Sequence, residues 1–343
     1  RRGIETRRCL ILKTSYTESL DPSGLFFNQK EHRMTFQLPP RKHFVHKAIE
    51  PRNLSPKVLA AADARQDDYW EVKYDGCCGM LIKAKGKAYA FSRQGEPVNG
   101  ALDRQLRAME SLAHDNYVLF VEGWAANLIH SDINGAFRRG YGDDEPRVLE
   151  SVIWDMVPLD TFMAGKGGLS YSTRSYEVDT VLFALRNFGF GHIFRKAFQA
   201  KSKLACESYI DSCREGRGEI FAVDGFMRKA SAGVWNAGAG SCGTILKDKE
   251  LLTVDLKVDG LVEGKGKFVG MLGAFECTYN GKPQLVGGGT LTDKQRLAIW
   301  NDKATVDGGI GSIIEVHALG ESTNGLLREP RFYCVRYDKT EGE

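Results

Sequence analysis

The sequence predicts an α+β protein of two domains, in which a larger part with antiparallel sheets precedes a small β-barrel. At 343 residues the chain is longer than a single hydrophobic core usually serves. Runs of strand length and of helix length are mixed along residues 57–214 without a regular βαβ alternation, which favours antiparallel sheets. Beyond about residue 250, short strands separated by glycines replace this mixture, as is typical of a barrel.

The elements of the first domain follow from the period of its apolar residues. The helical pattern predicts helices at residues 57–64, 101–113, 174–188 and 200–214. Alternating or continuous apolar runs predict strands at residues 69–74, 80–82, 88–91, 117–122 and 152–156. Asp75-Gly76 forms a turn signal directly after the first of these strands. Lys73 is therefore expected near the end of a strand.

The second domain is predicted from its density of short strands. Its strands are expected at residues 252–258, 267–279, 311–318 and 332–337, with a helix at residues 292–301. About five short strands in a stretch of this length favour an oligonucleotide-binding (OB) fold. We place the boundary near Glu250. The predicted parts are an N-terminal arm over residues 1–47, a first domain over 48–250 and the barrel over 251–343.

Composition and cysteine usage narrow the class of protein. The chain is 42% hydrophobic and 27% charged, as in ordinary soluble globular proteins. No apolar run approaches the roughly 20 residues that a membrane-spanning helix needs. The eight cysteines contain no C-x-x-C pair, which argues against a zinc site and against a disulfide framework. We expect a cytoplasmic protein in a reducing cytosol.

Positive charge is concentrated at the N-terminal end. Residues 1–47 hold ten Lys/Arg and four Asp/Glu, although the net charge of the whole chain is only +3. Aromatic side chains such as Phe36 and Phe44 alternate with basic ones such as Arg41 and Lys42. This pattern fits a segment that lies along a phosphate backbone. A solubilising tail or the remnant of a targeting peptide explains the charge equally well.

The segment Lys73-Tyr74-Asp75-Gly76 is the most informative motif. A lysine at a strand end, held before an Asp-Gly turn, is suited to carry a nucleotide covalently. The tetrapeptide alone is weak evidence for this function, because an unrelated chain of this length contains a K-x-D-G sequence by chance roughly one time in ten. The alternative interpretation of the motif is a strand that ends in an Asp-Gly turn with a solvated lysine beside it. To attack a phosphate the lysine must lose its proton, and nearby positive charge and burial favour that loss.

Further segments supply what such a reaction requires. Lys247 and Lys249 lie two residues apart in a strand and so share a face, where they could neutralise a triphosphate. Glu122 and Asp224 follow apolar strands and offer hard oxygen ligands for a divalent metal. Trp154 could stack on a purine. The alternatives are solubilising lysines, paired structural carboxylates and a core tryptophan.

The order of these segments resembles that of the ATP-dependent DNA ligases, most closely the small two-domain ligases of bacteriophages. The motifs are Lys73-Tyr74-Asp75-Gly76, Phe120-Val121-Glu122-Gly123, Trp154-Asp155, Asp224-Gly225-Phe226-Met227-Arg228-Lys229, Lys247-Asp248-Lys249, and Leu327-Arg328-Glu329-Pro330-Arg331-Phe332 followed by Arg336-Tyr337-Asp338-Lys339. The closing R-x-P-R-F with R-x-D-K is the most specific of them, since RNA ligases generally lack it. The resemblance covers residues 55–340.

This resemblance implies a nucleotidyltransferase (adenylation) domain followed by an OB domain, with ATP and Mg²⁺ as cofactors. Lys73 would attack the α-phosphate of ATP and keep AMP as a phosphoramidate. The AMP would pass to the 5′-phosphate at a nick in duplex DNA, and the 3′-hydroxyl would then displace it. The implied partner is nicked DNA and the expected state is a monomer, with roles in DNA replication, repair and recombination.

The resemblance also implies roles for single residues. Glu71 would accept a hydrogen bond from the adenine amino group, and Trp154 would stack on the base. Arg93 would contact the nucleotide and later the nick phosphate. Glu122 would engage the ribose or the metal, and Asp224 the metal.

The remaining roles concern the phosphates. Lys247 and Lys249 match the contacts to the α-phosphate, and Lys229 lies near the phosphates. Arg336 and Lys339 resemble the pair that the barrel brings over the pyrophosphate in the first step and removes afterwards. This implies a hinge near the domain boundary.

Three departures from the family pattern stand out. The first motif usually continues K-x-D-G-x-R, but Cys78 stands where the arginine is expected, and a thiol cannot replace a guanidinium. Either another basic residue takes its place or the nick is handled differently; Arg138-Arg139, Lys265 and Lys267 are further candidates for phosphate contacts. Asp224 replaces a glutamate, and the order Glu122-Gly123 reverses the usual Gly-Glu.

Two other readings stay open. An RNA ligase or an mRNA-capping guanylyltransferase also uses a lysyl-nucleotide, and Cys78 slightly favours the RNA ligase. A nucleic-acid-binding homologue without catalytic activity belongs to a different class. Lys73, the lysines at 247 and 249, and the pair at 336 and 339 argue against it.

Overall fold

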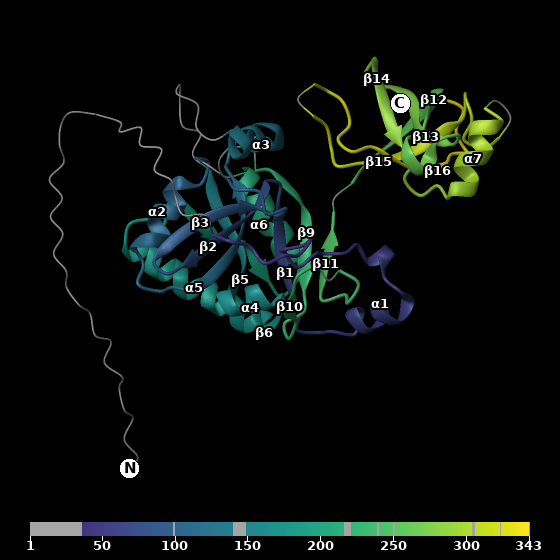
Figure 1. The fold of residues 1–343 in the computed structure, drawn as a ribbon. Coiled ribbons are helices and arrows are strands. Elements are labelled where there is room, and N and C mark those ends of the chain that lie inside the picture. Colours follow the sequence, from purple (N-terminus) through teal and green to yellow (C-terminus); the bar gives the residue numbers. More distant parts are fainter. Residues whose placement is uncertain are drawn as a thin grey trace, which may run out of the picture. The chain divides into compact units, whose positions relative to one another are not determined.

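Two mainly antiparallel sheets and a closed barrel form the fold of the computed structural model (Figure 1). The structure describes residues 36–98, 100–139, 149–215, 221–238, 240–249, 251–303, 306–322 and 324–342. The strands of the first part are β1 Tyr69–Tyr74, β2 Cys77–Ala84, β3 Lys87–Ser92, β4 Tyr117–Trp124, β5 Glu150–Pro158, β6 Lys166–Ser170, β7 Phe194–Lys196, β8 Gln199–Ala200, β9 Val223–Lys229, β10 Val234–Asn236 and β11 Ile245–Asp248. Its helices are α1 Pro56–Asp63, α2 Asp103–Ser111, α3 His130–Arg139, α4 Leu159–Ala164, α5 Tyr171–Asn187 and α6 Lys203–Glu215.

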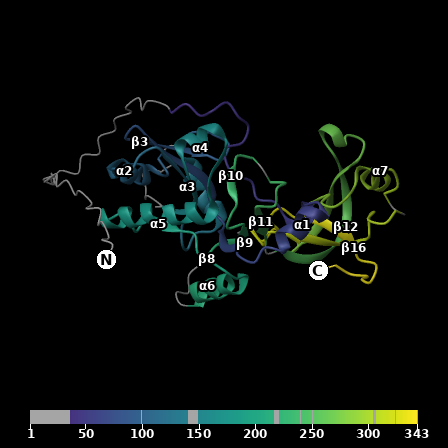
Figure 2. The ribbon, with the colours of Figure 1, turned by 90° about the horizontal axis from the view of Figure 1, so that it is seen from below.

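The two sheets carry the motif residues on different strands. One sheet has the order β11-β9-β1-β8 and the other the order β3-β2-β4-β5-β7; β10 and β6 form a separate pair. Strands β2 and β4 are buried almost throughout. Helix α5, the long helix labelled in Figure 2, packs on β5 and β7. Helix α6 packs on β1. Among the described residues, no helix is both long enough and apolar enough to cross a membrane.

The end of the predicted N-terminal arm is part of this domain. Phe44 is buried and its ring lies 6.4 Å from that of Phe162. The Arg41 guanidinium lies 4.7 Å from the centroid of the Phe162 ring and 5.7 Å from that of Trp235. Ile49 pairs with β11. Arg41 and Phe44, which belong to the predicted arm over residues 1–47, therefore pack on aromatic rings of the domain, whereas Lys42 and Lys47 are exposed. A phosphate-binding role for the arm stays a prediction. Residues 1–35 lie outside the described residues.

The barrel closes in the order β12-β13-β14-β16-β15. Its elements are β12 Leu252–Glu263, β13 Leu272–Tyr279, β14 Lys282–Gly287, α7 Asp293–Asn301, β15 Ile313–Ala318 and β16 Arg331–Val335. A separate apolar core, with Leu256, Phe275 and Ile314 fully buried, fills it. The predicted α+β class and the terminal barrel are confirmed.

Two sequence predictions differ from the observed strands. Residues 267–279 do not form one strand, because the 3-10 turn Gly266–Phe268 precedes β13 and both Gly266 and Gly270 have positive φ. Asp224 does not follow a strand but is the second residue of β9. Strand β14 and helices α3 and α4 were not predicted. Strand β14 and helix α4 have six residues each and leave little periodic signal, whereas α3 is amphipathic but holds few large apolar residues.

Candidate functional site

Lys73 lies at an irregularity between two strands. The register of β1 and β9 shifts between Val72 and Tyr74, and such a bulge re-aims the side chain it contains. The Lys73 Nζ donates to Oδ2 of Asp224 on β9. The Lys249 Nζ lies 3.3 Å from the same oxygen. The structure thus brings three of the predicted site residues together around one carboxylate.

Glu122 approaches this cluster from the other sheet. It lies opposite Cys78 in the register of β4 and β2. Burial raises the pKa of Glu122 to about 7, and the positive charge of Lys73 opposes that rise. The next residue, Gly123, has no side chain and lies opposite Cys77, whereas Glu122 lies opposite Cys78. Glu122, rather than a residue one position away, therefore presents its carboxylate toward Lys73.

Glu122 and Asp224 together fit a magnesium ion in part. Both are carboxylates close to Lys73, and Mg²⁺ is usually held by one or two carboxylates together with substrate phosphates. No cluster of three or more His, Cys, Asp or Glu that could hold a metal occurs among the described residues. The donor set matches a metal that is shared with a nucleotide rather than an all-protein site.

Trp154 and Glu71 lie around a buried polar network. The ring of Trp154 stacks on Phe120 with centroids 5.3 Å apart, and the Lys229 ammonium lies 5.2 Å from its centre. Lys229 donates to Glu71 Oε1 over 2.6 Å and to the Trp154 carbonyl over 2.8 Å. Tyr171 donates its hydroxyl to Glu71 Oε2 over 2.8 Å, and burial raises its pKa well above the usual value. Protein donors occupy both oxygens of Glu71, so its adenine contact stays a prediction.

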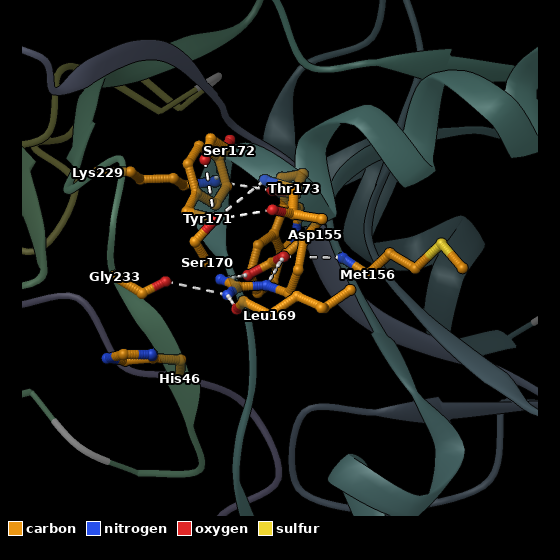
Figure 3. A network of polar contacts seen from close by, with 12 residues as sticks. His46, Asp155, Met156, Leu169, Ser170, Tyr171, Ser172, Thr173, Lys229 and Gly233 are labelled. Atoms are coloured by element: carbon orange, nitrogen blue, oxygen red, sulfur yellow. Dashed lines mark hydrogen bonds and ion pairs between the residues drawn. The ribbon is translucent and has the colours of Figure 1, made fainter.

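The strand that carries Trp154 is held by a buried ion pair (Figure 3). Arg174 on α5 binds both oxygens of Asp155, with Nε–Oδ1 and Nη2–Oδ2 distances of 2.7 and 2.9 Å. Its Nη1 also donates to the carbonyls of Leu169 and Gly233. The pair links β5, α5 and the β6–β10 region. Sequence reasoning missed Arg174, although a carboxylate inside the apolar strand signalled that some partner was needed.

Other predicted site residues lie apart from the Asp224 carboxylate. Lys247 points to Glu50, with Nζ–Oε1 3.5 Å, and does not share a partner with Lys249. Arg93 is exposed in the turn after β3, and its charge acts on the Cys78 thiol. Lys247 and Lys249, which strand alternation placed on one face, thus pair with different carboxylates, and Lys249 lies just beyond the end of β11 at Asp248.

Arg336 and Lys339 are bound within the barrel. Arg336 Nη1 lies 3.1 Å from both oxygens of Asp255 and 3.3 Å from Glu315 Oε2, while Lys339 also donates to Asp255. Arg336 pairs further with Asp338. Acidic partners of the barrel thus neutralise both cations in this structure.

Asp75 of the first motif has a partner from the barrel sequence. Arg328 donates to both of its oxygens, at 2.7 and 3.2 Å, and His130 Nδ1 lies 3.1 Å away. Burial opposes ionisation of Asp75, but the hydrogen bonds from His130 and Arg328 hold its pKa well below the usual value. Both Asp75 and Arg328 lie in motifs seen in the sequence, yet only the fold pairs residues this far apart.

Position 76 must be a glycine, because there is no room for a Cβ beside β4. A Cβ at this position would lie 2.5 Å from the Gly123 carbonyl oxygen and 2.8 Å from Glu122 Cγ. We expect Gly76→Ala to displace Glu122 and to slow nucleotide attachment by roughly 10²-fold, since small displacements at a reacting centre have effects of that size. Gly287→Ala is the control for a general glycine effect, because a Cβ there would meet only the Pro330 carbonyl oxygen, at 3.6 Å. Equal rates of labelling with α-labelled ATP in the two variants would contradict this prediction.

Comparisons with known proteins agree with this geometry. Residues 263–336 match the family model described as DNA ligase OB-like domain. A solved structure named Pmar-Lig_Pre has a TM-score of 0.69 and 22% identity, covering 87% of this chain and 69% of that one. One of the Lig E DNA ligases, described as binding DNA with a minimal scaffold, has a TM-score of 0.61 and 18% identity, with coverage of 85% and 98%.

A comparison with the curated proteins gives no match. The likeness to the solved structures extends over both sheets and the barrel, because it covers more than four fifths of the chain. The chain thus has the fold of these ligases, and its residues 263–336 are similar to the DNA ligase OB-like domain.

Proposed function

We propose that this chain is an ATP-dependent DNA ligase that seals nicks in duplex DNA through a lysyl-AMP intermediate. The observation that carries the proposal is the cluster of Lys73, Asp224 and Lys249, in which a lysine of the K-x-D-G motif shares one carboxylate with a second lysine. Glu122 lies on the facing sheet, and the OB-like barrel supplies a nucleic-acid-binding fold. We place the adenylation domain before Glu250 and the OB domain after it.

The proposed reaction consists of three in-line displacements at phosphorus. Lys73 Nζ attacks the α-phosphate of ATP, pyrophosphate leaves, and a P–N bond holds AMP. The 5′-phosphate at the nick then displaces the lysine, and finally the 3′-hydroxyl displaces AMP. Positioning and charge neutralisation carry most of the catalysis in such reactions. Lys249 binds the same Asp224 oxygen as Lys73 and so is placed to neutralise the negative charge of the α-phosphate that Lys73 attacks.

The proposed reaction requires several contacts seen in the structure to change when ATP binds. Lys73 must leave its ion pair with Asp224 before it attacks, since only the neutral amine has a lone pair for phosphorus. Trp154 stacks one ring face on Phe120, and a purine that stacks on this ring would lie close to the Lys229 ammonium, 5.2 Å from the ring centre. Arg336 and Lys339 must exchange Asp255 for pyrophosphate oxygens.

A magnesium ion would be held by Glu122 and Asp224 together with phosphate oxygens. It would supply charge neutralisation at the phosphates and would compete with Lys73 for the Asp224 carboxylate. The protein is expected to act as a monomer on nicked duplex DNA. The described cysteines are all free, which supports a reducing cytosol.

The test is covalent labelling followed by a chase. The protein is incubated with α-labelled ATP or α-labelled GTP and Mg²⁺, resolved by denaturing electrophoresis, and then given nicked DNA or nicked RNA. Label from ATP that is stable to denaturation and leaves as the DNA nick is sealed supports the proposal. Label from GTP alone would identify a capping enzyme, release only on RNA an RNA ligase, and no label a binding protein.

The N-terminal segment gives a separate prediction about DNA affinity. Residues 1–36 hold seven Lys/Arg and four Asp/Glu, and the unit that follows begins at Gln37. Removing residues 1–36 is expected to weaken binding to nicked duplex DNA and to reduce its salt dependence by about 0.9 in slope per lost phosphate contact. Titrations at several salt concentrations measure both quantities. Identical affinities for the full and shortened chains at every concentration would rule out a role for this segment.

A further inference from the structure

Helix α3 lies against the strands that carry the first motif. Its Phe137 ring packs on two glycines, since a Cβ at Gly79 or at Gly123 would lie 3.3 or 2.8 Å from that ring. Ile133 is fully buried on the same side. Glycines on two neighbouring strands therefore let the helix sit close to the start of β2. This packing fixes which α3 side chains face the Lys73-Tyr74-Asp75-Gly76 motif.

His130, Asn134 and Arg138 follow one another at a spacing of four and so share one face of α3. His130 binds Asp75, with Nδ1–Oδ1 3.1 Å. Asn134 Oδ1 accepts a weak hydrogen bond from the Cys77 thiol over 3.7 Å. The Arg138 charge acts on the same thiol. The row thus runs alongside the residues that directly follow Lys73.

The side chains of Asn134 and Arg138 on this face of α3 present N–H groups that can donate hydrogen bonds. Because the Asn134 oxygen faces Cys77, its amide Nδ2 is the group left to bind a further acceptor. Arg138 is exposed, and within the part of the chain that the structure describes it has no hydrogen bond or ion pair. A guanidinium presents several donors in a fork that fits phosphate oxygens.

The chain lacks the basic residue that the K-x-D-G-x-R pattern places close by. Cys78 occupies that position, and burial together with Glu122 raises the pKa of its thiol, so the side chain offers no positive charge. The charge of Arg93 acts on Cys78 and that of Arg138 on Cys77, and these two successive residues of β2 point to opposite faces of the sheet. Arg138 is therefore a basic side chain close to Cys77, the residue that directly follows the Lys73-Tyr74-Asp75-Gly76 motif.

We propose that His130, Asn134 and Arg138 form a phosphodiester-binding surface that holds the backbone of duplex DNA beside the nick. Arg138 and the Asn134 amide bind the phosphate oxygens, and His130 keeps the row in place through Asp75. The surface supplies a backbone contact beside Cys77, on the face of the sheet opposite to that of Cys78. This inference rests on the proposed ligase function and names where its DNA substrate is held.

The test compares Arg138→Ala and Asn134→Ala with Arg107→Ala, an exposed arginine of α2. Affinity for nicked duplex DNA is measured at several salt concentrations, and labelling by α-labelled ATP is measured without DNA. Arg138→Ala is expected to weaken binding roughly 10-fold and to lower the salt slope by about 1, with unchanged labelling. Arg138→Lys is expected to restore the slope, since it restores the charge.

An affinity and a slope for Arg138→Ala equal to those of Arg107→Ala would overturn the inference. The binding titration needs no catalysis and so decides this whether or not the protein is labelled. Absence of label from the unaltered protein would instead count against the ligase proposal. A denaturation curve for each variant confirms that a loss of affinity does not come from unfolding.

Discussion

Lys73→Arg is expected to reduce covalent labelling by ATP by at least about 10⁴-fold, because removal of an enzyme nucleophile has effects of this order or larger. Arginine can keep the ion pair with Asp224, so the fold around β1 and β9 is retained. Its guanidinium, however, is not deprotonated in proteins and cannot attack phosphorus. The measurement is the single-turnover rate of labelling, with the denaturation midpoint as a check on folding.

Lys87→Arg, at an exposed position on β3, is the matched control and should label at the unaltered rate. If Lys73→Arg also labels normally, another lysine carries the nucleotide. Lys249 is then the first alternative, because its Nζ lies 3.3 Å from the same Asp224 oxygen. Lys249→Arg would distinguish the two. It should slow labelling without abolishing it if Lys249 only neutralises the phosphate.

Strand prediction from the sequence succeeded where burial leaves a strong pattern. The strand at residues 69–74 was predicted with the observed bounds, and the continuous apolar run at 117–122 marks most of β4. Strand β14 was missed because it has only six residues, and helix α3 because its buried face consists of few large apolar side chains, Ile133 and Phe137. The class of fold depends on the long patterned elements, which explains why it was predictable.

The candidate site was predictable in its members but only partly in its contacts. Motif order identified Lys73, Asp224 and Lys249, which the structure gathers. The partner of Asp75 was not predictable, because Arg328 lies more than 250 positions away in the sequence. Lys247 shows a limit of strand alternation, since its nearest carboxylate is Glu50, whose approach depends on chain outside that strand.

Arg174→Met is expected to lower the free energy of unfolding by about 3–5 kcal/mol, the usual range when one partner of a buried ion pair is removed. Methionine has a similar volume, so the main effect is electrostatic: Asp155 would remain buried without its bidentate partner. Two carbonyls, those of Leu169 and Gly233, would lose a donor as well. Urea denaturation measures the change, with Arg186→Met on the exposed face of α5 as the control.

The double variant Arg174→Met/Asp155→Leu separates charge from packing. If the cost comes from an unpaired carboxylate, removing Asp155 as well should recover much of the lost stability, because an apolar pair often replaces a buried ion pair at little cost. If the double variant is less stable than Arg174→Met, the carbonyl contacts and packing of Arg174 dominate and the electrostatic account is wrong. Since β5 carries Trp154 next to Asp155, a folded double variant also shows whether the ion pair positions that ring: weaker ATP labelling at normal stability would indicate that it does.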